Sequence, residues 1–238
     1  MRTGNPALRS DVFTKIRSQD PANVMSIEGT VNKTFVLLFL VFFSASLVWR
    51  NPIPFMPFLW PLVFLGFIIA MVTIFKKEWS GFTSPVYAIV EGLFLGGISV
   101  MMERSYPGIV IQAVALTFGT LLCMLVAYKT GLIQVTNNFR LGVFAATGGI
   151  ALIYFVSIMG SFFGLRVPFI HEAGLVGIGF SLFVVTIAAL NLVLDFIEKG
   201  AQFGAPKYME WYGAFGLMVT LIWLYIEILR LLAKTRRR

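Results

Sequence analysis

Long apolar runs separated by short polar stretches are the dominant pattern of this chain. A helix needs roughly 20 apolar residues to cross a hydrocarbon core about 30 Å thick. The runs of about that length are Thr34 to Trp49, Phe58 to Phe75, Ser84 to Met102, Ile109 to Tyr128, Leu141 to Phe163, Ala173 to Ile197 and Trp211 to Leu232. Because only short connections separate them, the pattern predicts an all-α membrane protein, one domain of seven transmembrane helices.

The two ends of the chain are polar. Residues 1–32 are too long and too mixed in character to be the charged start of a cleavable signal peptide, so we interpret them as a polar N-terminal tail. Residues 33–233 form the predicted transmembrane domain, and residues 234–238 form a basic C-terminal tail.

Composition supports a membrane protein. The 238 residues are 58% hydrophobic and 13% charged, whereas soluble domains carry about 25% charged residues. The single cysteine, Cys123, lies within the fourth run, so no intramolecular disulfide is possible and a packing role is expected.

The net charge of +8 is interpreted as a signal of orientation rather than of nucleic-acid binding. A cytoplasmic N-terminus places most basic loop residues inside and leaves only Arg50, Arg104 and Arg166 in outer loops. The final segment, "LRLLAKTRRR", opposes this rule if all the runs cross. Either the last run crosses against the rule or it dips into the membrane and returns; we favour a full crossing because the apolar run around Leu217 to Ile226 is long enough.

The residues of most intramembrane enzymes are missing. The only histidine, His171, lies in the loop "RVPFIHEAG", and the chain contains no HExxH, no GxSxG and no glycine-rich phosphate loop. We therefore expect a protein that is not an enzyme and that carries no cofactor.

Acidic residues inside or at the edges of the runs are the candidate functional groups. A charge at the centre of a bilayer costs roughly 2.5 to 3.5 kcal/mol on insertion scales, so such residues usually have a function. They are Glu91 in "VYAIVEGLFLGG", Asp195 and Glu198 in "LVLDFIEKG", Glu210 in "PKYMEWYG" and Glu227 in "WLYIEILRLL".

The spacing of these acids suggests two kinds of interaction. Asp195 follows Asn191 by four positions and precedes Glu198 by three, so the three side chains share one helix face. Glu227 precedes Arg230 by three, which leaves open a local ion pair that only makes the last helix insertable. Carboxylates that meet in a poorly hydrated site cannot both ionise cheaply and act as a proton switch. Their oxygens also suit Ca²⁺.

Three segments of the chain are distinctive: "SPVYAIVEGLFLGGIS", "ALNLVLDFIEKGA" and "EWYGAFGLMVTLIWLYIEILRLL". With the pattern of seven spans, they resemble the Bax inhibitor-1 family, most closely its bacterial YccA-like branch. The N-terminal "NPAL" and "SDVF" are also similar to that branch. The resemblance implies a seven-helix fold whose last helix is surrounded by the other six. It also implies a proton-sensitive Ca²⁺ leak.

By motif, Asp195 and Glu227 match an acidic pair on the sixth and last helices of relatives. The resemblance therefore implies that they sense protons together. Because carboxylate oxygens suit Ca²⁺, Asp195 and Glu227 are also our candidate Ca²⁺ contacts. If the last helix begins at Trp211, Glu227 lies about 24 Å along it and cannot touch Asp195. If the spanning part begins near Gly216, Glu227 moves inward and the two can meet. Glu210 is the alternative partner for Asp195 or Glu198.

We therefore expect a pH-sensitive cation leak channel with Ca²⁺ as the transported ion, in a bacterial cytoplasmic membrane. The alternative is a non-conducting regulator that binds other membrane proteins, such as a quality-control protease, through its N-terminal tail. The partners that we expect for this protein are the lipid bilayer, Ca²⁺ and protons, and in the alternative a membrane protease. We expect no nucleic acid.

Overall fold

The computed structural model describes residues 23–130, 136, 138, 141–143, 145–146, 148–149 and 174–236. The chain divides into two compact units. The first contains residues 1–101 and 193–219, and the second contains residues 102–192 and 220–238.

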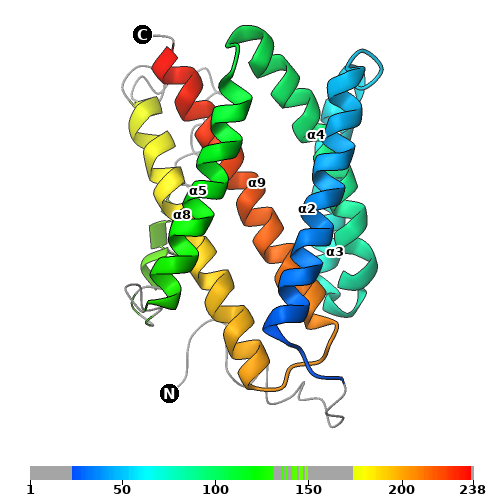
Figure 1. The fold of residues 1–238 in the computed structure, drawn as a ribbon, viewed down its shortest axis with the longest axis vertical. Coiled ribbons are helices and arrows are strands. Elements are labelled where there is room, and N and C mark those ends of the chain that lie inside the picture. Colours follow the sequence, from blue (N-terminus) through cyan, green and yellow to red (C-terminus); the bar gives the residue numbers. More distant parts are fainter. Residues whose placement is uncertain are drawn as a thin grey trace, which may run out of the picture. The chain divides into compact units, whose positions relative to one another are not determined.

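Helices make up almost all of the described secondary structure (Figure 1). The α-helices are α2 (Ile27–Arg50), α3 (Leu59–Phe75), α4 (Ser80–Ser105), α5 (Ile109–Lys129), α8 (Gly174–Gln202) and α9 (Met209–Arg236). Two short 3-10 turns, Met56–Phe58 and Lys77–Trp79, precede α3 and α4. The prediction of an all-α protein is confirmed.

Five described segments are long and apolar enough to cross a membrane. They are Ile27–Arg50, Met56–Phe75, Lys77–Ser105, Ile109–Val126 and Met209–Arg236. The sixth predicted span coincides with α8, which has 29 residues. The fifth, Leu141 to Phe163, lies mostly outside the described residues. The protein is thus a multi-pass membrane protein.

Helix α2 begins earlier than hydropathy alone predicts. It starts at Ile27, within the segment that we interpreted as a tail, because Ser26 caps it by accepting a hydrogen bond from the Gly29 amide. Glu28 in the first turn also favours a helix start, since it complements the helix dipole. The polar residues 27–32 are therefore the first turns of α2, and residues 1–22 lie outside the described part.

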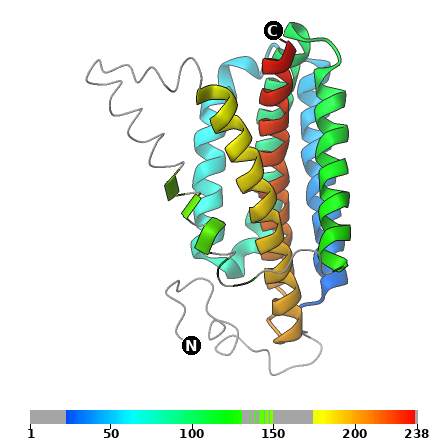
Figure 2. The same cartoon turned by 90° about the vertical axis from the view of Figure 1, so that its left-hand side faces the viewer.

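In the first unit, α2, α3 and α4 run side by side (Figures 1 and 2). Helix α2 buries one stripe at three- and four-residue spacing, as expected of a helix that packs on one face. The stripe consists of Thr30, Thr34, Leu37, Val41, Ser44 and Val48. Gly92 of α4 lies against it, because a Cβ there would be 2.5 Å from the Val41 carbonyl oxygen. The glycine lets the two backbones approach closely.

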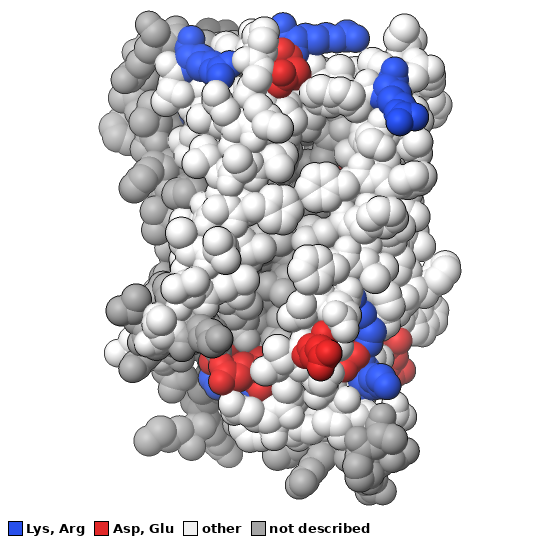
Figure 3. Space-filling model, in the orientation of Figure 1, with Lys and Arg blue, Asp and Glu red and all other residues white. Residues whose placement is uncertain are grey.

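The outward faces of these helices are apolar. Figure 3 shows a surface made mostly of uncharged residues on the face that it draws. Large exposed side chains on α2 and α3 include Phe35, Phe39, Phe43, Trp60, Phe64 and Phe67. Such faces suit contact with lipid.

In the second unit, two polar contacts fix the ends of α5 and α9. Glu103 accepts hydrogen bonds from the amides of Gly108, at 2.6 Å, and Val110, at 3.1 Å, and so caps the start of α5. Arg236, at the end of α9, donates to the Pro107 carbonyl at 2.7 Å and to Gln112 Oε1 at 3.0 Å.

Helix α9 is the most buried of the five candidate spans in the described residues. Of its most apolar stretch, 61% is buried, against 11% for Met56–Phe75. That the other six helices surround the last helix stays a prediction.

Candidate functional site

Asp195 lies on α8 with only 8% of its surface exposed. Lys199, one turn further along, is paired with it: Nζ lies 2.8 Å from Oδ1 and donates to Oδ2 at 2.9 Å. Glu198 accepts a hydrogen bond from Gln202 at 3.2 Å. The buried Asn191 donates to the Ile187 carbonyl at 3.1 Å. The predicted polar face of this helix therefore carries its own i,i+4 contacts.

Glu227 on α9 is almost completely buried, with 1% of its surface exposed. Arg230 donates to its Oε1 at 3.0 Å, which is the local ion pair that the spacing suggested. Its second oxygen, Oε2, has no hydrogen-bond partner among the described residues. A buried polar atom without a partner costs about 1 to 3 kcal/mol, and more if it is charged. Among the described residues, therefore, only one of the two carboxylate oxygens of Glu227 has a hydrogen-bond donor.

Asp195 and Glu227 belong to different compact units. Their predicted contact stays a prediction. What the described residues do show is a basic residue within one turn of each acid, Lys199 for Asp195 and Arg230 for Glu227. The i,i+4 spacing between Asp195 and Lys199 is a signal in the sequence from which this ion pair could have been predicted.

Glu91 on α4 faces protein, as its position within a span required. Tyr87, one turn earlier, forms a side-chain hydrogen bond with it. Its carboxylate lies over Gly66 of α3, where a Cβ would be 2.7 Å from Oε1. The Tyr87 ring in turn meets Phe215 edge to face, with 5.1 Å between centroids. Glu91 thus sits at the meeting of α3 and α4.

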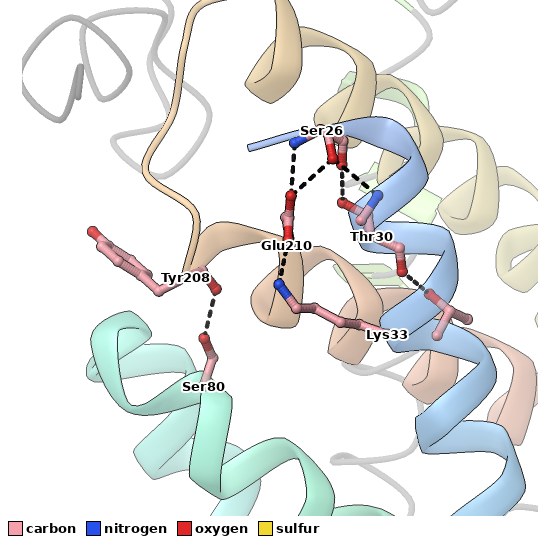
Figure 4. Close-up of polar contacts among 8 residues, drawn as sticks. Ser26, Thr30, Lys33, Ser80, Tyr208 and Glu210 are labelled. Atoms are coloured by element: carbon pink, nitrogen blue, oxygen red, sulfur yellow. Dashed lines mark hydrogen bonds and ion pairs between the residues drawn. The ribbon is translucent and has the colours of Figure 1, made fainter. Parts of the chain in front are cut away.

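Glu210 in the first turn of α9 is bound by α2 (Figure 4). The Ser26 amide and hydroxyl each donate to its Oε1 at 2.9 Å, and Lys33 pairs with Oε2. These contacts are with Ser26 and Lys33 of the first unit, and the role of Glu210 as an alternative partner for Asp195 or Glu198 stays a prediction. Neither contact is predictable from local spacing, because Ser26 lies 184 positions and Lys33 lies 177 positions from Glu210 in the sequence.

The connection between α8 and α9 has further polar contacts. Ser80, at the start of α4, donates to the Tyr208 carbonyl at 3.0 Å (Figure 4). Lys33 lies over the Trp211 ring at 5.4 Å. Burial, and to a smaller degree the charge of Glu78, raises the pKa of the Tyr208 phenol. Tyr208 is therefore neutral at every physiological pH and cannot act as a proton sensor there.

The described residues contain no group of three or more His, Cys, Asp or Glu side chains that could hold a metal ion. His171 lies outside them. Ca²⁺ contacts at Asp195 and Glu227 remain a prediction. Two carboxylates would contribute only part of the six to eight oxygen ligands that Ca²⁺ takes.

The fold and its buried acids define a class: an all-helical, multi-pass membrane protein with ionisable groups inside its spans. The family described as Bax inhibitor 1 like matches residues 5–237, so the chain belongs to that family. Searches of curated proteins and of solved structures returned no match. Assignment to the YccA-like branch stays a prediction.

Proposed function

We propose that this protein is a pH-sensitive cation leak channel, with Ca²⁺ as the transported ion, gated by protonation of Asp195 and Glu227. The observation that carries the proposal is Glu227: a carboxylate with 1% of its surface exposed, in a membrane-spanning helix, with one oxygen unpartnered among the described residues. Family membership supports it.

The chemistry of gating follows from what each protonation state needs. A protonated carboxyl can donate a hydrogen bond to another carboxylate, so a pair that shares a proton holds two helices together. Loss of that proton leaves two negative charges, which repel each other and attract a cation. Lys199 and Arg230 moderate this repulsion, because each lies within 3.0 Å of one acid.

The proposal includes an orientation and a membrane. The N-terminus is cytoplasmic, because basic residues then gather on the inner side. The membrane is the bacterial inner membrane. No catalytic step and no cofactor belong to this function.

The test is Ca²⁺ flux into liposomes that contain the purified protein and a Ca²⁺ dye, recorded from about pH 5 to 8. Asp195→Asn and Glu227→Gln remove one titrating group each, and we expect either change to abolish or shift the pH dependence. Glu78→Gln is the matched control, because Glu78 is an exposed acid. Its flux should follow that of the wild type.

Flux that is absent at every pH, in protein shown to be folded, would overturn the channel and favour the regulator. A regulator that binds a membrane protease through its tail would lose its partner when residues 1–20 are deleted. A channel would keep its flux after the same deletion.

A further inference from the structure

The start of α2 forms a receptor for a carboxylate, and Glu210 of α9 occupies it (Figure 4). The Ser26 amide and hydroxyl hold Oε1, and Lys33 holds Oε2. The same Ser26 hydroxyl accepts from the Gly29 amide at 2.9 Å, so the helix cap and the bound carboxylate share one oxygen. A helix N-terminus favours negative charge, which adds to the attraction.

Gly29 completes the receptor by leaving space. A Cβ at this position would lie 2.5 Å from the Glu210 carboxyl carbon and 2.6 Å from its Oε2. The carboxylate therefore rests on the bare backbone of α2. Any other residue at position 29 would push it away from the groups that bind it.

Backbone hydrogen bonds extend this junction on one side. The Met25 amide donates to the Ala205 carbonyl at 2.7 Å, and the Lys207 amide donates to the Asn23 carbonyl at 2.9 Å. The chain that enters α2 is thus paired, antiparallel, with the connection between α8 and α9. Glu210 lies just beyond this pairing in the sequence, and the hydrogen bonds to its carboxylate continue the contact between the two segments.

We infer that Ser26, Gly29 and Lys33 form a carboxylate latch that binds Glu210 and ties the first turn of the last helix to the N-terminal end of α2. Glu210 is a positioning residue in this arrangement. Release of the latch would free the start of α9 to move and so increase the cation leak. This second step rests on the proposed function. The binding of the carboxylate does not depend on it.

Gly29→Ala tests the latch because we expect it to speed amide exchange, whereas replacing glycine by alanine in a helix normally slows it. Alanine normally stabilises a helix relative to glycine. Here its Cβ displaces the Glu210 carboxylate, so amide hydrogen exchange at residues 23–26 and 205–210 should become at least about tenfold faster. The matched control is Gly119→Ala on α5, where a Cβ meets nothing within 4 Å. It should leave exchange at those residues unchanged.

A double substitution tests whether both changes act on one interaction. Glu210→Gln should also speed exchange, and Gly29→Ala should add little to it, because the carboxylate is already lost. Full additivity, or exchange in Gly29→Ala that stays at the wild-type rate, would overturn the latch.

Small carboxylates test the receptor directly. In Glu210→Ala the receptor is empty, and acetate or formate should slow amide exchange at residues 23–26, whereas chloride at equal ionic strength should not. If neither acetate nor formate slows exchange, these residues do not form a carboxylate receptor. Glu28→Ala, which removes an exposed acid from the same turn, should show no response to either anion.

Ca²⁺ flux separates the latch from the proposed function. Glu210→Gln and Gly29→Ala should raise leak severalfold at a fixed pH, and Glu28→Gln should not. If the wild type conducts and the latch variants leak no faster, the coupling to the leak is refuted. If the wild type does not conduct, the channel fails while the exchange measurements still decide whether the latch exists.

Discussion

Arg230 Nη1 lies 3.0 Å from Glu227 Oε1, yet 56% of the Arg230 side chain is exposed and only 2% of the Glu227 side chain is. One end of this ion pair is therefore buried and the other is accessible. The pair offers a way to change the charge around a buried acid without removing the acid.

Arg230→Met should move the pH midpoint of flux upward. The positive charge favours the ionised carboxyl, so without it Glu227 holds its proton to higher pH and opening is delayed. Arg230→Lys keeps the charge and should keep the midpoint close to that of the wild type. A midpoint that is the same in all three proteins would exclude Glu227 from gating.

Gly92→Ala should destabilise the protein by about 1 to 3 kcal/mol, because overpacking forces neighbouring groups apart. The new Cβ would lie 2.5 Å from the Val41 carbonyl oxygen and 2.9 Å from its Cα, and backbone atoms cannot yield as side chains do. Thermal unfolding in detergent is the measurement. Gly119→Ala is the control and should be neutral or stabilising. Equal unfolding temperatures for both variants would contradict the close approach of α2 and α4.

Glu103→Ala should loosen the start of α5 at a cost of roughly 1 kcal/mol, the usual effect of losing a helix cap. Its carboxylate accepts from the Gly108 and Val110 amides, which would then have only water. Amide exchange at residues 108–110 should accelerate while exchange in α2 stays the same. Unchanged exchange at these amides would show that Glu103 does not cap the helix.

Cys123 should resist a charged, membrane-impermeant maleimide in intact proteoliposomes. Its side chain is exposed in the protein alone, but it lies in the apolar helix Ile109–Val126, so lipid covers it in a membrane. Labelling should become complete after the protein is unfolded in dodecyl sulfate. Rapid labelling in intact vesicles would place this part of α5 next to water.

The sequence predicted long apolar helices because a long apolar run is a strong signal, but it did not predict where helix α2 begins. Hydropathy treats residues such as Glu28 and Lys33 as outside a span, yet a helix can begin in polar residues when a cap is present. Ser26 was such a cap, and its serine side chain directly before a helical turn was a signal that hydropathy does not register.

Contacts of the candidate acids within one helix could be predicted from the sequence, but contacts between distant segments could not. The Glu227 to Arg230 pair follows from spacing within one helix, and so does the Asp195 to Lys199 pair. Glu210 and Ser26 are 184 positions apart, and only the folded chain brings them together. Sequence alone identified Glu210 as an acid inside or at the edge of an apolar run, but the identity of its partner depends on tertiary structure.

Helix α3 has an unusual dependence on its surroundings. Only Gly66 and Thr73 are buried along Leu59–Phe75, and Thr73 donates a hydrogen bond to Thr83 of α4 at 2.8 Å. In a bilayer we therefore expect acyl chains to cover most of the surface of this helix and to supply packing contacts that α2 and α4 do not. Detergents that strip these lipids should release α3 first, so the annular lipid becomes a structural component to be retained during purification.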